Sequence, residues 1–308
     1  MKITKENTAK PFIKWAGGKS QLINEIETVI QKQKEDKFTY IEPFVGGGAI
    51  LFWMLENYPN LEKVIINDLN SDLIFTYKTI KENVDELIKI LKLWEIEYHK
   101  LENLSEERKI YYYKKRELFN SRKSDEVTQS ALFIFLNRTC FNGLYRVNKK
   151  NKFNVPIGSY KKPMICDEEN LYAVNKALQK VEILNGDFSK TLEFADKDTL
   201  YYLDPPYKPL SKTSSFNSYA KEEFNDYEQI RLKEFCDKLD KLGHQWILSN
   251  SDVKSKNPND NFFDDLYSDY HITRIKARRN INANGNKRGQ LNELLITNYE
   301  YEQVVSLA

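Results

Sequence analysis

The stretch FTYIEPFVGGG at residues 38–48 decides the fold that the sequence predicts. Its first residues are aromatic or β-branched, as is typical of a buried strand. Pro43 stops that strand, and three glycines then permit a tight turn and a close approach of the backbone to a ligand. The apolar run from about 49 to 56 predicts a helix. Strand, glycine loop and helix in this order begin a doubly wound nucleotide-binding fold.

The chain continues this alternation of strands and helices. A second strand at residues 63–66 leads to Asp68, which lies 22 residues after Gly46, an offset that suits a bond to ribose hydroxyls. Further strands are expected near 181–184, 199–203, 245–249, 271–276 and 293–298, with helices near 168–179, 189–195, 223–242 and 260–266. The sequence therefore predicts an α/β fold with seven strands.

A helical stretch interrupts the alternation. Helical spacing of apolar residues covers parts of 71–136, with helices expected near 84–94, 106–119 and 126–136. Two short strand-like runs then flank residues 148–152, which predicts a hairpin or an extended loop. We expect a main domain formed by residues 1–70 and 168–308 and an inserted domain at 71–167.

The N-terminal stretch FIKWAGGKS, residues 12–20, precedes an expected helix for which Ser20 is a candidate N-cap. Its end resembles a phosphate-binding P-loop, but Ile13 stands where that loop requires glycine. Likewise, Gly46-Gly47-Gly48 is not the dinucleotide fingerprint G-x-G-x-x-G. The first departure argues against a nucleotide triphosphatase, and the second argues against a nicotinamide oxidoreductase.

Composition and charge narrow the class of protein. The chain has 308 residues, 41% hydrophobic, and no apolar run long enough to span a membrane. Three widely spaced cysteines indicate a reduced, cytoplasmic setting, and they form no metal-type cluster with the three histidines. Net charge is only +2, yet residues 138–162 and 274–288 hold seven and six basic residues without an acid. Such stretches suit a polyanion.

Asp204-Pro205-Pro206-Tyr207 follows the strand at 199–203 and forms a stiff corner, because each proline fixes its own backbone angle. An acid followed three residues later by an aromatic ring suits a flat polar ligand: the acid binds its edge and the ring covers its face. Asp-Pro also begins plain turns. On these four residues alone, a ligand site and an ordinary strand-ending turn are equally good interpretations.

The order of the motifs favours the ligand site. Residues 12–20, 42–48, Asp68, 186–188, 204–207 and 248–250 together resemble the Dam-type DNA adenine N6-methyltransferases over nearly the whole chain. Residues 141–146 resemble the recognition hairpin of family members that methylate GATC sites, including those of GATC restriction-modification systems. Residues 278–280 and 292–295 resemble the family's C-terminal segment.

This resemblance implies a Rossmann-like, seven-stranded methyltransferase fold with an inserted helical and hairpin target-recognition domain. It also implies S-adenosylmethionine as the methyl donor, without a metal. The residues that correspond to the family's cofactor site are Trp15, Lys19, Phe44, Gly46, Gly48, Asp68, Asp187, Phe188 and Asp204. Each has a plainer alternative: Trp15 as core, Lys19 as a solvated side chain, and Asp68 and Asp187 as caps.

We expect Asp204, Pro205, Pro206 and Tyr207 to act on an adenine flipped out of the duplex. Tyr207 would stack on the base, while Asp204 and the Pro205 carbonyl would accept the two amino protons. Holding both protons directs the nitrogen lone pair at the methyl group, so direct transfer needs no covalent intermediate. Cytosine C5 chemistry, which needs a thiol directly after proline, is disfavoured because none of the cysteines follows one.

The hairpin would read the DNA. We expect Arg146 to contact a guanine edge, with Asn142, Leu144 and Tyr145 nearby, although a phosphate contact is the alternative for Arg146. The residues expected to position the phosphate backbone are Arg138, Lys149, Lys150, Lys152, Arg278 and Arg279.

The sequence thus predicts a site-specific, adenine-specific DNA methyltransferase that binds double-stranded DNA as a monomer. The resemblance implies that the methylated adenine lies in GATC and that the protein is bacterial or phage-encoded. A cognate restriction endonuclease acting separately is an optional partner. The alternatives are a methyltransferase for cytosine N4 or RNA adenine, and a catalytically inactive DNA-binding homologue.

Overall fold

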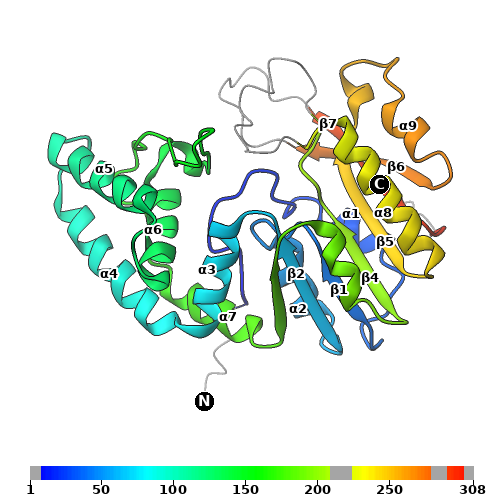
Figure 1. Cartoon of the computed structure of the whole chain (residues 1–308), viewed down its shortest axis with the longest axis horizontal. Coiled ribbons are helices and arrows are strands. Elements are labelled where there is room, and N and C mark those ends of the chain that lie inside the picture. The colour runs from blue at the N-terminus through cyan, green and yellow to red at the C-terminus, as the bar shows by residue number, and fades with distance from the viewer. Residues whose placement is uncertain (1–7, 209–223, 279–289, 302–308) are drawn as a thin grey trace, which may run out of the picture.

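A computed structural model describes residues 8–208, 224–278 and 290–301. Seven strands form one sheet in the order β3-β2-β1-β4-β5-β7-β6, which confirms the predicted fold class (Figure 1). β1 to β5 run parallel, and β7 is antiparallel to both β5 and β6. The strands are β1 (Thr39–Glu42), β2 (Lys63–Asp68), β3 (Val181–Asn185), β4 (Thr199–Leu203), β5 (Gln245–Ser251), β6 (His271–Arg278) and β7 (Gln290–Thr297).

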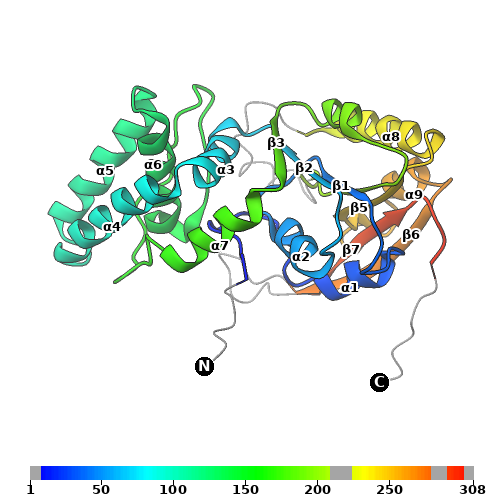
Figure 2. The same ribbon diagram turned by 90° about the horizontal axis from the view of Figure 1, so that it is seen from below.

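Helices cover both faces of the sheet. α1 (Ile23–Val29) and α2 (Ala49–Asn57) lie on one face, and α8 (Asp226–Lys241) lies on the other, as Figure 2 shows from below. Alternate strand residues therefore enter different cores: Tyr40 packs with the α1 and α2 side, whereas Ile41 packs with Leu232 and Leu239 of α8. Burial on both faces explains why these strands are continuously apolar.

The helical part joins β2 to β3. It comprises α3 (Ser71–Glu82), α4 (Val84–Lys100), α5 (Glu106–Ser121), α6 (Glu126–Thr139) and the short η1 (Phe141–Gly143), followed by α7 (Glu168–Leu178). α6 is buried on all sides from Ser130 to Asn137, because α3, α4 and α5 enclose it. α3 packs on both the sheet and α6, so it connects the two parts of the molecule.

Buried Arg108 of α5 ties the end of the hairpin segment to the helices. Its guanidinium donates to the carbonyls of Tyr98, Tyr160 and Lys161, and it lies over the Tyr98 ring at 4.6 Å. Its buried Nε has no partner among the described residues, but its terminal nitrogens are paired, and the carbonyls that pair them fix where the chain passes after the hairpin.

Some local expectations were wrong. Ser20 does not cap a helix: α1 begins at Ile23 after Leu22, and no side chain caps it. The helix expected at 189–195 is the 3₁₀ helix η2 (Phe188–Phe194), capped by Asp187. α8 begins at Asp226 rather than 223, because Asn225 accepts a hydrogen bond from the Glu228 amide and so caps it. The last helices are η4 (Val253–Ser255) and α9 (Phe262–Leu266).

The glycine loop is closely packed. Gly48 has φ +78°, and a Cβ there would lie 2.5 Å from the Tyr77 hydroxyl and 2.9 Å from the Phe52 ring. At Gly46 an added Cβ would lie 2.9 Å from the Trp15 ring. The loop therefore tolerates no side chain at these positions, and the rings of Trp15 and Tyr77 line it.

Gly48→Ala should lower the free energy of unfolding by about 2–4 kcal/mol, from left-handed strain plus overpacking. Gly243→Ala is the matched control, because Gly243 has φ +77° with nothing within 4 Å of an added Cβ. Strain alone should cost it about 1–2 kcal/mol. Urea denaturation of both variants checks this; equal losses would contradict the packing argument.

Candidate functional site

The candidate site lies where the order of the parallel strands reverses. β1 pairs with β2 on one side and β4 on the other, so the chain winds outward in both directions from this pair. In such sheets ligands bind beyond the carboxyl ends of the strands at this switch point. Pro43, Asp68 and Asp204 all stand at that edge, immediately after or at the end of β1, β2 and β4.

Asp204 is the centre of a buried polar cluster. Its Oδ1 lies 2.8 Å from the Lys19 Nζ and accepts a hydrogen bond of 3.0 Å from the Ser249 hydroxyl. The Lys19 side chain is only 5% exposed, and that of Asp204 is 19% exposed. Burial raises the pKa of the Asp204 carboxyl above its ordinary value, while Lys19 and Ser249 act in the opposite direction. Both donors use Oδ1, which leaves Oδ2 as an acceptor without a partner among the described residues.

Hydrogen bonds to α8, β5 and β7 hold the corner that follows Asp204. Gln229 of α8 donates to the Pro206 carbonyl (3.2 Å), and Ser251 of β5 donates to the Lys208 carbonyl (3.2 Å). The Tyr207 hydroxyl donates to Oε2 of Glu293 on β7 at 2.6 Å. The Lys19 Nζ lies 4.4 Å from the centroid of the Tyr207 ring. The acid, the ring and the ammonium group therefore form one cluster, to which β4, β5 and β7 contribute.

Asp68 supports the glycine loop. Its two carboxylate oxygens accept hydrogen bonds from the amides of Gly46 (3.1 Å) and Asn70 (2.8 Å). Burial nevertheless raises the pKa of Asp68 to about 6. The neighbouring Asn67 donates to the carbonyls of Pro43 and Gly186, while its buried Oδ1 has no partner in the described part of the chain. Acceptors thus line the ends of β1, β2 and β3.

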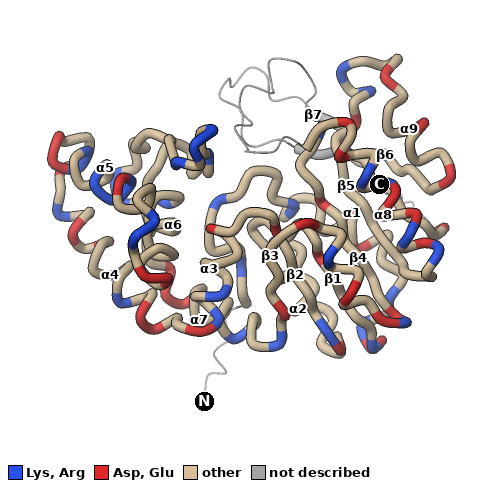
Figure 3. The backbone as a smooth tube through the Cα atoms, viewed as in Figure 1, with Lys and Arg blue, Asp and Glu red and all other residues tan. Residues whose placement is uncertain are grey.

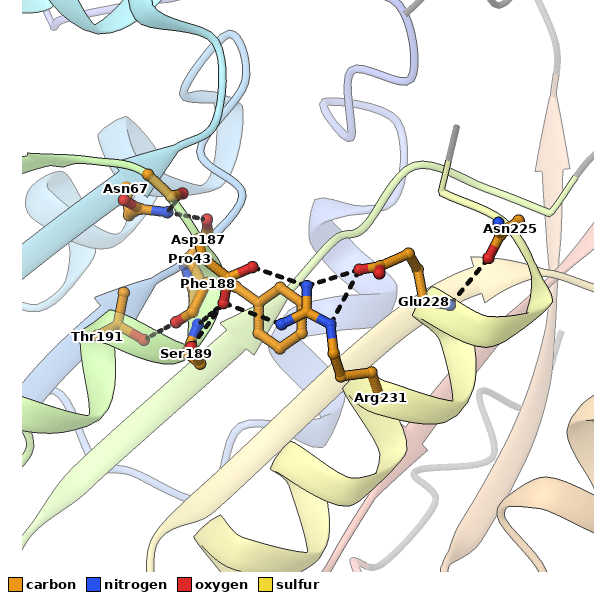
Figure 4. A network of polar contacts seen from close by, with 10 residues as sticks. Pro43, Asn67, Asp187, Phe188, Ser189, Thr191, Asn225, Glu228 and Arg231 are labelled. Atoms are coloured by element: carbon orange, nitrogen blue, oxygen red, sulfur yellow. Dashed lines mark hydrogen bonds and ion pairs between the residues drawn. The ribbon is translucent and has the colours of Figure 1, made fainter. Parts of the chain in front are cut away.

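Asp187 is held by an arginine that the sequence analysis did not identify. Arg231 of α8 donates to both of its oxygens, at 3.0 and 2.7 Å, and also bonds Glu228 (Figure 4). The Arg231 hydrogen bonds lower the pKa of Asp187 to about 2. Ser189 and Arg231 both donate to Oδ1, whereas among the described residues Oδ2 accepts from Arg231 alone.

Aromatic rings lie next to this ion pair. Phe188 is 5.4 Å from Phe44 and 6.4 Å from Phe224, and the Arg231 guanidinium covers its ring at 4.3 Å. Phe44 follows the end of β1, so the ring pair connects the glycine loop to the end of β3. The arrangement places a cluster of packed rings next to one carboxylate at the ends of β1 and β3.

The expected hairpin is present as two antiparallel bridges, Val147 with Phe153 and Cys140 with Ile157. Tyr145 lies inside it rather than on its surface. Its ring stacks on Trp15 at 5.6 Å, and its hydroxyl donates to Asp72 at 2.7 Å. Because Trp15 also covers the glycine loop, Tyr145 links the hairpin to the candidate cofactor site.

Arg146 is oriented by a neighbour on the opposite arm. Its Nε donates to Asn154 at 2.7 Å, which leaves the two terminal nitrogens of the guanidinium for a ligand. Asn142 (φ 55°) and Leu144 are exposed nearby, and Lys149, Lys150 and Lys152 are exposed on the turn. Figure 3 shows this concentration of basic residues along the hairpin.

The other expected DNA contacts are placed differently. Arg138 donates to the Phe12 carbonyl at 2.8 Å, and burial lowers its pKa, so it supports the N-terminal segment from within. Arg278 ends β6, far along the chain from the hairpin, and its side chain is outside the described residues, as is all of Arg279.

Within the described ranges, no three His, Cys, Asp or Glu side chains converge as a metal site would require. No helix there combines the length and hydrophobicity of a membrane span.

Comparison with known proteins identifies the family. Residues 15–281 match the D12 class N6 adenine-specific DNA methyltransferases. The chain belongs to this family. The enzyme class and the methyltransferase fold expected from the sequence are therefore confirmed.

Relatives match along almost their whole length. Type II methyltransferase M.MjaIII of Methanocaldococcus jannaschii is 52% identical over 295 residues, which are 94% of this chain and 99% of the relative. Type II methyltransferase M1.LlaDCHI of Lactococcus lactis subsp. cremoris is 38% identical, covering 94% and 95%. A DNA adenine methylase of Haemophilus influenzae is 39% identical, covering 93% and 92%.

Four side chains in the site escaped the sequence analysis: Ser249, Arg231, Glu293 and Asn154. The motifs around Ser249 and Glu293 were recognised, but nothing local assigns them a role. Arg231 and Glu228 are an i,i+3 pair, which marks a helix face. Its bond to Asp187, 44 residues away, is visible only in the fold.

Arg231→Leu should raise the pKa of Asp187 from about 2 toward about 3.9. A lowered pKa stabilises the fold above the unfolded value, and this contribution is lost as pH falls from about 4 to 2. Urea denaturation should show the variant less stable at pH 6, on the order of 1 kcal/mol because solvent screens the half-exposed pair. The gap should narrow at pH 3. Asp187→Asn should show the same pH-dependent loss of stability. A difference in the free energy of unfolding that is the same at pH 6 and pH 3 would contradict the claim that Arg231 lowers the pKa of Asp187.

Proposed function

We propose that the protein transfers a methyl group from S-adenosylmethionine to the N6 amine of an adenine flipped from duplex DNA, within GATC. One observation carries the proposal: Asp204 is fixed through Oδ1 by Lys19 and Ser249, and the same Lys19 ammonium lies 4.4 Å from the centroid of the Tyr207 ring, which brings the acid and the ring into one cluster. An acceptor and a stacking surface in one rigid corner are what an extruded base with an exocyclic amine requires.

The residues around the switch point fit the cofactor. Its adenine would lie against the packed rings of Phe44 and Phe188, with Asp187 Oδ2 accepting from its amine. Asp68 would accept hydrogen bonds from the ribose hydroxyls. Each of its oxygens accepts from one backbone amide and has a second lone pair for another donor. Gly46, Gly48 and Trp15 would line the space between, and Lys19 would reach the amino-acid end.

When bound, the cofactor supplies an electrophilic methyl carbon on a sulfonium. Asp204 Oδ2 and the Pro205 carbonyl would each accept one amino proton of the target adenine, which aims the nitrogen lone pair. The buried carboxylate also stabilises the positive charge that develops on that nitrogen. After the transfer the cationic nitrogen gives one proton to solvent water, so Asp204 acts by position and charge more than as a strong base.

The hairpin supports duplex DNA as the substrate. Arg146, anchored by Asn154, presents two nitrogens suited to a guanine edge, and Asn142 and Leu144 lie beside it. Lys149, Lys150 and Lys152 would contact phosphates. Relatives include type II methyltransferases, so a separate endonuclease is a compatible partner, and we propose that the protein acts as a monomer.

Nucleoside mass analysis after incubation with labelled S-adenosylmethionine tests this function. A duplex with one GATC site should yield N6-methyladenine, and a scrambled duplex or the RNA equivalent should yield little. Asp204→Ala should lower the rate at least about 100-fold, since it removes the charged acceptor. Asp265→Ala, an exposed acid of α9, is the control. Methylcytosine, or equal transfer to RNA, would contradict the proposal.

Arg146→Ala should remove discrimination at one base pair of the site, by about 1–3 kcal/mol. Competition binding with duplexes that carry single base changes measures this loss. Asn154→Ala should weaken the same position less, because it frees the Arg146 side chain without deleting it. Lys150→Ala should weaken all duplexes evenly. Even weakening by Arg146→Ala would show that it binds a phosphate instead.

A further inference from the structure

The contact between Tyr207 and Glu293 has no role in the account above. The Tyr207 hydroxyl donates to Glu293 Oε2 at 2.6 Å, and both side chains are half-buried. Glu293 lies on β7, in register with Ser251 of β5 and Ile275 of β6. A residue in the middle of three paired strands has a fixed backbone, so it can hold a ring in place.

The other bonds to the corner hold its backbone. Gln229 binds the Pro206 carbonyl, and Asn250 in turn donates to Gln229 at 3.1 Å. Ser251 binds the Lys208 carbonyl. These contacts leave the two side-chain torsions of Tyr207 undetermined. Within the described part of the chain, Glu293 is the residue that fixes the polar end of the ring.

Glu293 is the acceptor of this hydrogen bond. Burial, with Asp204 and Glu293 nearby, keeps the Tyr207 pKa well above its ordinary value, so the phenol is the donor and the carboxylate the acceptor. A charge-assisted bond of this kind is stronger than a neutral one.

We propose that Glu293 is a positioning residue for methyl transfer, which orients the Tyr207 ring toward the flipped base. The proposal rests on the proposed function. It assigns to the antiparallel strand β7 a direct part in base capture, in addition to closing the sheet.

The test compares steady-state kinetics of Glu293→Leu, Glu293→Gln and Tyr207→Phe on the GATC duplex. Glu293→Leu should lower kcat/KM for DNA about 10- to 100-fold while the Kd for S-adenosylmethionine stays unchanged. Glu293→Gln should recover most of that loss, because its amide oxygen still accepts from the phenol. In a Tyr207→Phe background, Glu293→Leu should add nothing, since the bond is already absent.

A duplex with 2-aminopurine at the target adenine reports base capture directly. Glu293→Leu should change its fluorescence on binding relative to the wild type, and Glu293→Gln should not. The matched control is the Tyr111–Glu97 pair of the helical part, which has the same 2.6 Å contact. Glu97→Leu should leave both kinetics and fluorescence unchanged. Thermal denaturation establishes that each variant is folded.

The outcomes are separable. Two results would overturn the role of Glu293 while the wild type still methylates adenine. One is a Glu293→Leu variant as active as the wild type. The other is an equal loss of activity when Glu293→Leu is introduced into the wild type and into the Tyr207→Phe variant. If Glu293→Leu does not fold, the remaining variants decide. A positioning role predicts near-wild-type activity for Glu293→Gln. It also predicts that the double variant with Tyr207→Phe is no less active than Tyr207→Phe alone. If the wild type itself transfers no methyl to adenine, the proposed function is overturned together with this proposal.

Discussion

The structure of the site depends on one buried ion pair, between Lys19 and Asp204. Lys19 comes from the loop before α1 and Asp204 from the end of β4, so the contact joins segments 185 residues apart at the switch point of the sheet. Removing either partner would leave an uncompensated buried charge, which costs about 3–5 kcal/mol. The pair also decides geometry: with Lys19 on Oδ1 and over the Tyr207 ring, the oxygen without a partner among the described residues is Oδ2.

The same loop connects the two halves of the reaction that we propose. Trp15 contacts the glycine loop on one side and stacks on Tyr145 of the hairpin on the other. Asn137 of α6 bonds both the amide and the carbonyl of Lys14, which holds the loop against the helical part. The hairpin and the candidate cofactor site therefore share packed rings and are not joined by a linker alone.

The sequence predicted the fold well because its signals are local. The apolar runs of β1 and β4 end at Pro43 and Asp204, and each strand is short and bounded by breakers. Motif order supplied the family. The partners of the site residues were not predictable, since Arg231 meets Asp187 and Glu293 meets Tyr207 only through long-range packing. Arg138 was expected to contact DNA because it lies in a basic stretch. In the structure its guanidinium donates to the Phe12 carbonyl, a partner that the sequence does not indicate.

The most direct test of the central ion pair is a carbon-13 NMR titration of the Asp204 carboxyl, assigned with Asp204→Asn. In the wild type its pKa should lie above the ordinary value of 3.8, because burial outweighs Lys19 and Ser249. In Lys19→Met it should rise further, since the ammonium that favours the charged form is gone. An unchanged or lower pKa in Lys19→Met would contradict the claim that Lys19 holds this carboxylate charged and in place.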